Sequence, residues 1–193
     1  MTDRSHTPKG QRARDRIVTA AETLLATRGF HGTSTREVAA AAKLPLATTI
    51  YHFPRQEQLY AAVLERIAAE LVDELATVGR EPDADLALDQ LAQVLARWAA
   101  RRPDRVRLLL RELLDNPLRL PHVHKLPLAP VLAHAAAIVR AGVAAGVADV
   151  DDAELCVLHF VGALSYFVAA RPTVERIVGP RARASSRPPT SVR

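Results

Sequence analysis

The side chains best suited to chemistry lie on a short segment that carries hydrogen-bonding groups and no acidic residue. They are Thr48, Thr49, Tyr51 and His52. Arg36 stands earlier, near the start of a predicted helix, where its guanidinium can reach a guanine edge or a phosphate. Neutral hydrogen-bonding groups beside an arginine predict a surface that binds nucleic acid. For Tyr51 and His52 the alternative is to close a small core, which is the role that we expect for Phe53.

Two short helices must position these side chains. Ser34 and Glu37 have the Ser-x-x-Glu spacing of a capping box, which opens a helix over residues 35–42. A three-residue turn leads to a second helix over 46–52. Because helices this short are unstable alone, they must pack on the apolar face of a third, predicted over 11–28. This spacing predicts a helix-turn-helix, whose second helix lies in the major groove of DNA.

The net charge of +5 is distributed unevenly along the 193 residues. Residues 1–55 carry five more basic than acidic side chains, and residues 179–193 carry four basic and no acidic ones. Residues 56–178 carry four more acidic than basic side chains. A polyanion should therefore approach the N-terminal part and the tail, although a merely solubilising surface would show the same pattern.

Composition and missing motifs exclude several classes of protein. A hydrophobic content of 49% is too high for a disordered chain. Cys156 is the single cysteine, which excludes an internal disulfide and a zinc site of four thiolates. Residues 1–16 lack the apolar stretch of a signal peptide, so we expect a cytoplasmic protein. Dinucleotide, phosphate-loop, zinc-protease and serine-hydrolase motifs are missing, and we expect neither an enzyme nor a cofactor.

The fold class is predicted to be all-α, because no stretch shows sustained apolar–polar alternation or a hairpin signal. The expected parts are a flexible basic arm, a helix-turn-helix head, a helical body and a disordered basic tail, over residues 1–10, 11–60, 79–178 and 179–193. A fourth helix should continue from the head to about residue 78. Prolines divide the body into helices predicted over 86–101, 103–115, 128–148, 152–170 and 173–178.

The body carries more apolar surface than one chain can readily cover. Residues 155–170 are apolar on every face, and these 16 residues are fewer than the roughly 20 that span a bilayer. A second copy of the chain is the economical cover, and a helix buried centrally in one chain is the alternative. The residues expected at this dimer interface are Leu155, Leu158, Val161, Leu164 and Phe167.

A metal site is a weaker prediction for the body. Cys156 and His159 share one helix face, and His122 and His124 lie on a proline-rich loop, so zinc or nickel could use them. Because no close tetrahedral spacing is visible, ordinary structural roles are favoured and no metal is expected.

Residues 13–60 resemble the DNA-binding head of TetR-family transcriptional regulators. The matching features are Ala20-Ala21, Gly29-Phe30, Thr33-Ser34, Val38-Ala39, the segment 48–53 and Glu57-x-Leu59. The resemblance implies that Thr35 and Arg36 contact DNA from the first short helix. It also implies that the recognition helix faces DNA with Leu46, Ala47, Thr48, Tyr51 and His52.

The head departs from the family pattern at positions that bear on DNA binding. Lys43 replaces the usual turn glycine and would be strained in a left-handed conformation. Ile50 stands where an aromatic residue, commonly a phosphate-binding tyrosine, is usual. Gln56 replaces the usual lysine, and Arg55 the usual serine, at the start of the fourth helix. We count both in the DNA-binding set and expect Arg55 to supply the phosphate-binding charge.

The resemblance also implies a homodimeric repressor that binds a palindromic operator and is released by a small molecule held in the body. Candidate residues of that pocket, by type and location, are Trp98, Leu109, Leu113, His134, Ile138 and Phe160. Two alternatives stay open: a non-enzymatic helical interaction module, and a metal-responsive regulator that uses Cys156 and His159.

Overall fold

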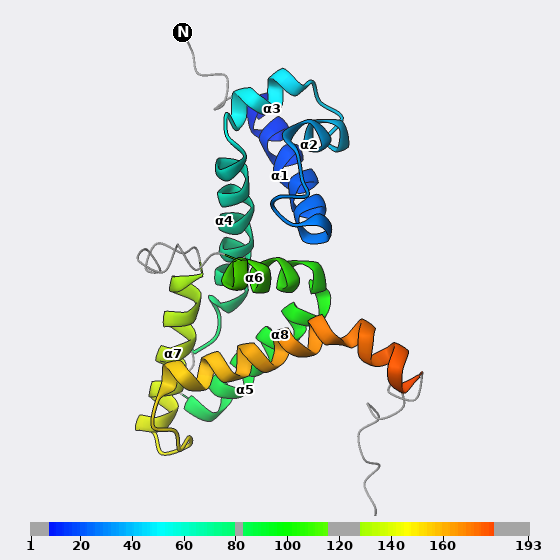
Figure 1. Ribbon diagram of the computed structural model, residues 1–193. Coiled ribbons are helices and arrows are strands. Elements are labelled where there is room, and N and C mark those ends of the chain that lie inside the picture. Colours follow the sequence, from blue (N-terminus) through cyan, green and yellow to red (C-terminus); the bar gives the residue numbers. More distant parts are fainter. Residues whose placement is uncertain (1–7, 80–82, 116–127, 180–193) are drawn as a thin grey trace, which may run out of the picture.

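The computed structural model describes residues 8–79, 83–115 and 128–179, and every regular element within these ranges is a helix. The helices are α1 (Pro8–Arg28), α2 (Thr35–Ala41), α3 (Leu46–His52), α4 (Gln56–Leu75), α5 (Ala84–Arg101), α6 (Pro103–Asp115), α7 (Ala129–Ala144) and α8 (Ala153–Val178). Helices α1 to α3 form the head at one end of the molecule (Figure 1). Helix α4 runs from the head to the body, which comprises α5 to α8. The predicted all-α class with a helix-turn-helix head is confirmed.

The head is held together by a local cap and by burial against α1. Ser34 Oγ accepts a hydrogen bond from the Glu37 N–H at 3.3 Å, and the Glu37 carboxylate accepts one from the Ser34 N–H at 2.9 Å. The predicted capping box is therefore present. The side chains that fill the core of the head are Ile17, Val18, Ala21, Leu25, Val38 and Phe53. The core role expected for Phe53 is confirmed.

The turn between α2 and α3 contains a left-handed residue that is not glycine. Lys43 has a φ of 53°, in the region where a side chain costs about 1–2 kcal/mol. Arg16 of α1 stabilises this turn, because its Nη2 donates to the carbonyl oxygens of Ala42 at 2.6 Å and Lys43 at 3.2 Å. Helix α1 thereby fixes the turn that sets the angle between α2 and α3.

The N-terminal segment begins its first helix earlier than predicted, and both ends of the chain lie outside the described residues. Helix α1 begins at Pro8, three residues earlier than predicted, because proline is favoured at the first helical position. Residues 8–10 are therefore helical and not part of an arm. Residues 1–7 and 180–193, where the rest of the arm and most of the tail were predicted, lie outside the described residues.

Two helices end before their predicted boundaries, each followed by a glycine with positive φ. Helix α4 ends at Leu75 and Gly79 follows with a φ of 75°; α7 ends at Ala144 and Gly146 follows with a φ of 72°. Glycine adopts this left-handed conformation without a steric penalty, so it marks where the chain leaves a helix.

The predicted break at Pro172 is wrong, because α8 continues through this residue to Val178. A proline inside a helix costs about 3 kcal/mol through one lost hydrogen bond and a clash. Arg171 and Glu175, which flank it, form an ion pair at 2.8 Å. With 26 residues, α8 also meets the length and composition of a membrane span, a test that core helices of soluble proteins pass as well.

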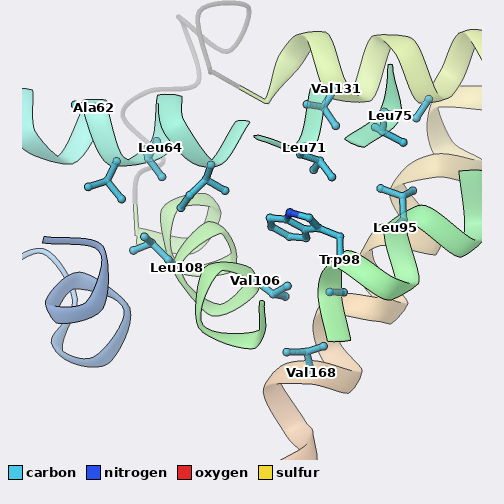
Figure 2. Close-up of a cluster of buried hydrophobic side chains, with 14 of the residues drawn as sticks. Ala62, Leu64, Leu71, Leu75, Leu95, Trp98, Val106, Leu108, Val131 and Val168 are labelled. Atoms are coloured by element: carbon cyan, nitrogen blue, oxygen red, sulfur yellow. The ribbon is translucent and has the colours of Figure 1, made fainter. Parts of the chain in front are cut away.

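The body core surrounds Trp98 of α5 (Figure 2). Leu71 of α4, Val106 of α6, Val131 of α7 and Val168 of α8 lie around the indole, so every helix of the body contributes to this core. Helix α4 packs on α1 of the head and on α5 and α7 of the body. The orientation of the head therefore depends on how α4 sits in the body.

Candidate nucleic-acid interface

The exposed face of α3 carries the side chains that the sequence predicts will contact DNA. Tyr51 is 56% exposed, and Ala47 and Ile50 are exposed beside it. The half-buried members of the predicted set on this helix are Leu46, Thr48 and His52. The rings of Tyr51 and His52 meet edge to face, with centroids 5.3 Å apart, so the two side chains form one polar and aromatic surface.

Thr49 lies on the opposite face of α3. Its side chain is fully buried, and its hydroxyl has no hydrogen-bond partner within the described residues. Side chains two positions apart on a helix point about 200° apart, so Thr49 faces away from the exposed Tyr51 and into the core of the head. The prediction that Thr49 is a hydrogen-bonding group available to DNA is therefore wrong.

The start of α2 adds an exposed cation to this surface. Arg36 is exposed and Thr35 is half-buried. Hydrogen bonds from the hydroxyl and then the N–H of Ser34 lower the pKa of Glu37 below its ordinary value. The ionised Glu37 pairs with Arg28 at 2.6 Å. Arg28 thereby compensates the negative charge of Glu37, which lies next to Arg36 on the predicted DNA-binding face.

The two predicted contacts at the start of α4 behave differently. The Gln56 amide nitrogen donates to the carbonyl oxygens of Phe30 at 2.7 Å and Thr33 at 2.6 Å. Because an amide nitrogen has two hydrogens, Gln56 has no donor left for a phosphate in this conformation. Gln56 instead ties α4 to the loop between α1 and α2. Arg55 is exposed, and its backbone N–H donates to the Gln58 side chain at 3.2 Å.

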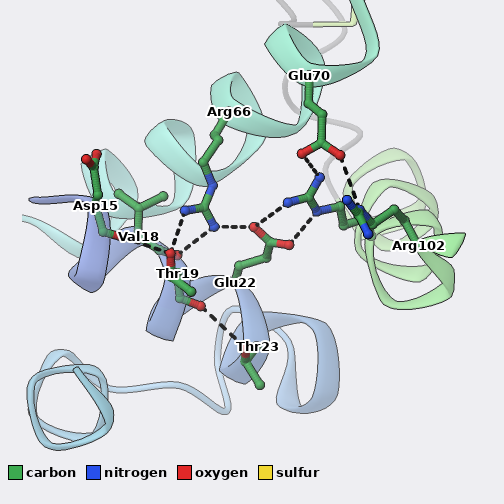
Figure 3. A network of polar contacts seen from close by, with 9 residues as sticks. Asp15, Val18, Thr19, Glu22, Thr23, Arg66, Glu70 and Arg102 are labelled. Atoms are coloured by element: carbon green, nitrogen blue, oxygen red, sulfur yellow. Dashed lines mark hydrogen bonds and ion pairs between the residues drawn. The ribbon is translucent and has the colours of Figure 1, made fainter. Parts of the chain in front are cut away.

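A polar junction joins the head to α4 and to the body (Figure 3). Arg105 of α6 pairs with Glu22 of α1 and with Glu70 of α4. Arg66 of α4 also pairs with Glu22, and Arg102 pairs with Glu70 at 3.2 Å. The Arg105 side chain is only 13% exposed, so these charges interact in a partly desolvated site. The sequence analysis missed this junction, because its members are separated by up to 83 residues.

The junction has a measurable dependence on pH. The hydrogen bond from Arg105 is the main cause that lowers the pKa of Glu70 below its ordinary value of 4.5. A carboxyl group with a lowered pKa stabilises the folded state above its ordinary pKa. This contribution is lost as the pH falls through the lowered value.

We expect Arg105→Met to reduce the free energy of unfolding by about 1–3 kcal/mol at neutral pH. The loss of stability should be smaller than for a carboxylate left with no partner, because Glu22 still pairs with Arg66 and Glu70 still pairs with Arg102. The difference from the unmodified protein should begin to shrink near the ordinary pKa of 4.5, where Glu70 of the unfolded chain binds a proton, and should be lost as the pH falls through the lowered pKa of the folded state. Urea unfolding between pH 7 and pH 3 measures both effects.

Arg107→Met on the same helix is the control, because Arg107 pairs only with the exposed Asp104 in the described structure. An equal loss in both variants would contradict the prediction.

The body contains an apolar cavity of about 240 Å³. Its lining comes from α4 to α8 and includes Trp98 and Leu109 of the six predicted pocket residues. Three other predicted pocket residues do not line this cavity. His134 is exposed, and Ile138 is buried next to Gly79. Phe160 is 37% exposed. The Leu113 side chain lies outside the described part of the structure.

The predicted dimer residues of α8 lie on two faces. Leu155 and Phe167 are exposed, Leu158 is exposed at the edge of the cavity, and the half-buried Val161 and Leu164 line it. Large apolar side chains that are exposed on the same helix but were not predicted are Tyr166, Val174, Ile177 and Val178. The apolar surface of α8 therefore extends well beyond the predicted set.

Two family models match this chain. The model described as bacterial regulatory proteins of the tetR family matches residues 17–63. The model described as the C-terminal domain of the HTH-type transcriptional dual regulator CecR matches residues 84–187, which is more than half of the chain. The chain belongs to the TetR family. Members of this family are transcriptional regulators, in agreement with the prediction that the chain is not an enzyme.

Individual relatives within the TetR family agree with this assignment. The HTH-type transcriptional repressor Rv3405c of Mycobacterium tuberculosis is 35% identical over 97 residues, which cover 50% of this chain and 52% of that protein. The chain thus spans about half the length of the curated relatives it matches.

Solved structures show the same fold over most of the chain. HlyIIR, a hemolysin II transcriptional regulator, matches with a TM-score of 0.65 and 23% identity over 87% of this chain and 90% of that one. The fatty acid degradation regulator FadR from Bacillus halodurans matches with a TM-score of 0.70 and 19% identity over 88% and 87%.

The metal hypothesis gains no further ligand from the described structure. Cys156 is half-buried and His159 is exposed. No group of three or more His, Cys, Asp or Glu side chains comes together within residues 8–79, 83–115 and 128–179. His122 and His124 lie outside these ranges.

Proposed function

We propose that this TetR-family chain is a DNA-binding transcriptional regulator whose helix α3 enters the major groove. The carrying observation is the exposed face of α3, where Tyr51 is 56% exposed while Thr49 on the opposite face is fully buried. Such an arrangement holds the helix rigidly in the head and leaves base-contacting side chains exposed at the surface. The proposed contact residues, without Gln56, are Thr35, Arg36, Leu46, Ala47, Thr48, Tyr51, His52 and Arg55.

We further propose that two chains form a homodimer through α8. Exposed apolar side chains extend along α8 from Leu155 to Val178, a surface that a single described chain leaves uncovered. Large exposed apolar patches mark interaction sites, and a twofold dimer is the commonest arrangement. Two heads related by a twofold axis would bind a palindromic operator, with half-sites separated by a whole number of helical turns.

The proposed dimer acts as a repressor that occupies a promoter and is released by a small molecule. A relative that is itself named a repressor supports this direction of control. The cavity offers a place for the ligand, and the Arg105 junction connects its α6 wall to α1 and α4. A ligand weakens DNA binding only if it favours a head orientation that does not fit the operator. Such a regulator would work in the cytoplasm, where its DNA is.

The test is binding of the full chain to mixed genomic fragments over a series of salt concentrations. A regulator should retain a few sequences at salt concentrations that release the bulk of the DNA, and its affinity should fall steeply as salt rises. Equal retention of all fragments, or no retention at low salt, would contradict the proposal. The second outcome is what a helical interaction module would give. Dependence of selectivity on added zinc or nickel would favour the metal-responsive alternative with Cys156 and His159.

Arg55 is expected to supply a phosphate contact at the start of α4. Arg55→Ala should weaken binding to all DNA sequences and reduce the slope of log affinity against log salt by about 1 per protomer. Arg97→Ala removes an equally exposed charge from the body, where Arg97 bonds to Gln93, and should leave the slope unchanged. An Arg55→Ala protein that keeps both its affinity and its salt slope would refute this contact.

A further inference from the structure

The cavity of the body is lined by a buried donor, the indole N–H of Trp98, that no acceptor among the described residues satisfies. Trp98 lines the cavity and is 4% exposed, and its indole nitrogen has no hydrogen-bond partner within the described residues. In Figure 2 this nitrogen lies on the edge of the indole that faces Leu71, which also lines the cavity. Leaving a buried N–H without an acceptor costs about 1–3 kcal/mol, so folding alone gives no reason for this arrangement.

The shape and lining of the cavity define what could accept this hydrogen bond. Among the described residues, those that line the cavity are apolar except for Glu112 and Ser165. An engineered apolar cavity of about 150 Å³ holds benzene, so by the same ratio a cavity of about 240 Å³ holds about ten non-hydrogen atoms. A ligand of that size would bury a predominantly apolar surface and need one acceptor, placed against the Trp98 nitrogen.

The lining also opposes a negatively charged ligand. Glu112, a carboxyl side chain that is 8% exposed, lines the cavity, and no basic side chain is among the described lining residues. A carboxylate ligand would therefore leave water for a site where no described lining side chain carries the opposite charge. An uncharged acceptor, such as the oxygen of a ketone, ester or amide, avoids this cost.

We propose that the body cavity binds an uncharged, predominantly apolar molecule of about ten non-hydrogen atoms, whose single acceptor oxygen receives a hydrogen bond from Trp98 Nε1. The idea that this ligand controls DNA binding rests on the proposed regulatory function, whereas binding of the ligand to the cavity does not. The binding experiment therefore contains no DNA, and DNA binding is measured separately. A protein that binds the ligand and not DNA contradicts the proposed function alone.

The experiment compares three probes of nine non-hydrogen atoms by calorimetry: acetophenone, α-methylstyrene and benzoate. α-Methylstyrene replaces the ketone oxygen of acetophenone by a carbon of similar size, and benzoate replaces the acetyl group by a carboxylate. Trp98→Phe keeps an aromatic ring and removes the N–H. This substitution should weaken the binding of acetophenone about three- to tenfold more than the binding of α-methylstyrene, because one neutral hydrogen bond contributes about that much to affinity. Each probe is compared between the two proteins, so the difference in hydration between the probes cancels from the ratio of the two affinity changes.

Benzoate should bind roughly tenfold or more weakly than acetophenone to the unmodified protein. Two leucine substitutions on α5 then test the location: Ala99 lines the cavity, and the neighbouring Ala100 is exposed. Ala99→Leu should abolish binding of both neutral probes, and Ala100→Leu should bind them like the unmodified protein. Circular dichroism of each variant establishes that it is folded.

Four results would overturn the proposal. The first is an acetophenone-to-α-methylstyrene ratio that is unchanged by Trp98→Phe. The second is equal binding by folded Ala99→Leu and Ala100→Leu proteins, and the third is no binding of either neutral probe by the unmodified protein. The fourth is benzoate that binds as tightly as acetophenone. Since Trp98 is the single tryptophan of the chain, its fluorescence gives an independent signal of ligand at the indole.

Discussion

Phe167→Glu is expected to convert the proposed dimer into monomers and to weaken binding to the proposed palindromic operator about 100- to 10,000-fold. Phe167 is 64% exposed on α8, so the unpaired monomer tolerates a charge there. In the proposed dimer, the glutamate would place a charge in an apolar interface, where burial of a charge is costly. The large effect arises because two linked heads bind two half-sites together, and a monomer loses that linkage.

Sedimentation velocity measures the oligomeric state, and titration of a full operator and a single half-site separates the two contributions. The Phe167→Glu protein should bind a single half-site with the same affinity as the unmodified protein does. Phe167→Leu keeps an apolar side chain and should remain dimeric. Val72→Glu introduces the same charge at an exposed position of α4 and should also remain dimeric. A Phe167→Glu protein that sediments as a dimer would show that this part of α8 lies outside the interface.

The local architecture of the head could be predicted because its signals are contained in a few neighbouring residues. Ser34 and Glu37 form the capping box that their spacing predicts. Lys43 adopts the positive φ expected at the family's glycine position. Phe53 lies in the core, as expected for a large apolar residue at the end of a short helix.

Predictions failed where a side chain's surroundings come from distant parts of the chain. Thr49 has the same polar type as Thr48, and only packing against the rest of the head decides that Thr49 is buried. Gln56 occupies a family DNA-contact position, but its amide bonds to two carbonyls of the α1–α2 loop. Pro172 is a different case: it is exposed and lacks an N–H, and yet α8 continues through it, so the general preference of proline against a helix interior did not decide the local structure.

The pocket and the junction show the same limit more strongly. Side chains from α4 to α8 line the cavity, so only Trp98 and Leu109 of the predicted set were placed correctly among the described side chains. Glu22 and Arg105 are ordinary charged residues in sequence, and their pairing becomes visible only when α1 and α6 are side by side. Charged residues that interrupt apolar helices were the available signal, but spacing within one helix cannot identify a partner on another.

Arg36→Ala and Tyr51→Ala should each remove sequence selectivity while leaving the dimer and the fold intact. A good base contact contributes about 1–3 kcal/mol of discrimination, so each half-site should lose preference by about 5- to 150-fold. Both side chains are exposed, and their removal leaves no cavity in the core of the head. Binding to non-specific DNA should change little for Tyr51→Ala, because the phosphate-binding charges remain.

The measurement is competition between the selected operator and unrelated duplexes at fixed salt. Tyr51→Phe separates the hydroxyl from the ring: selectivity lost in Tyr51→Phe identifies a hydrogen bond, and selectivity retained identifies contact by the aromatic ring with a base. Arg97→Ala, on the body, should keep the full preference for the operator. If both Arg36→Ala and Tyr51→Ala retain that preference, sequence selectivity does not come from this face of α2 and α3. The exposed Ile50, where the family commonly has an aromatic residue, would then be the next position to substitute, because it lies on the same exposed face of α3.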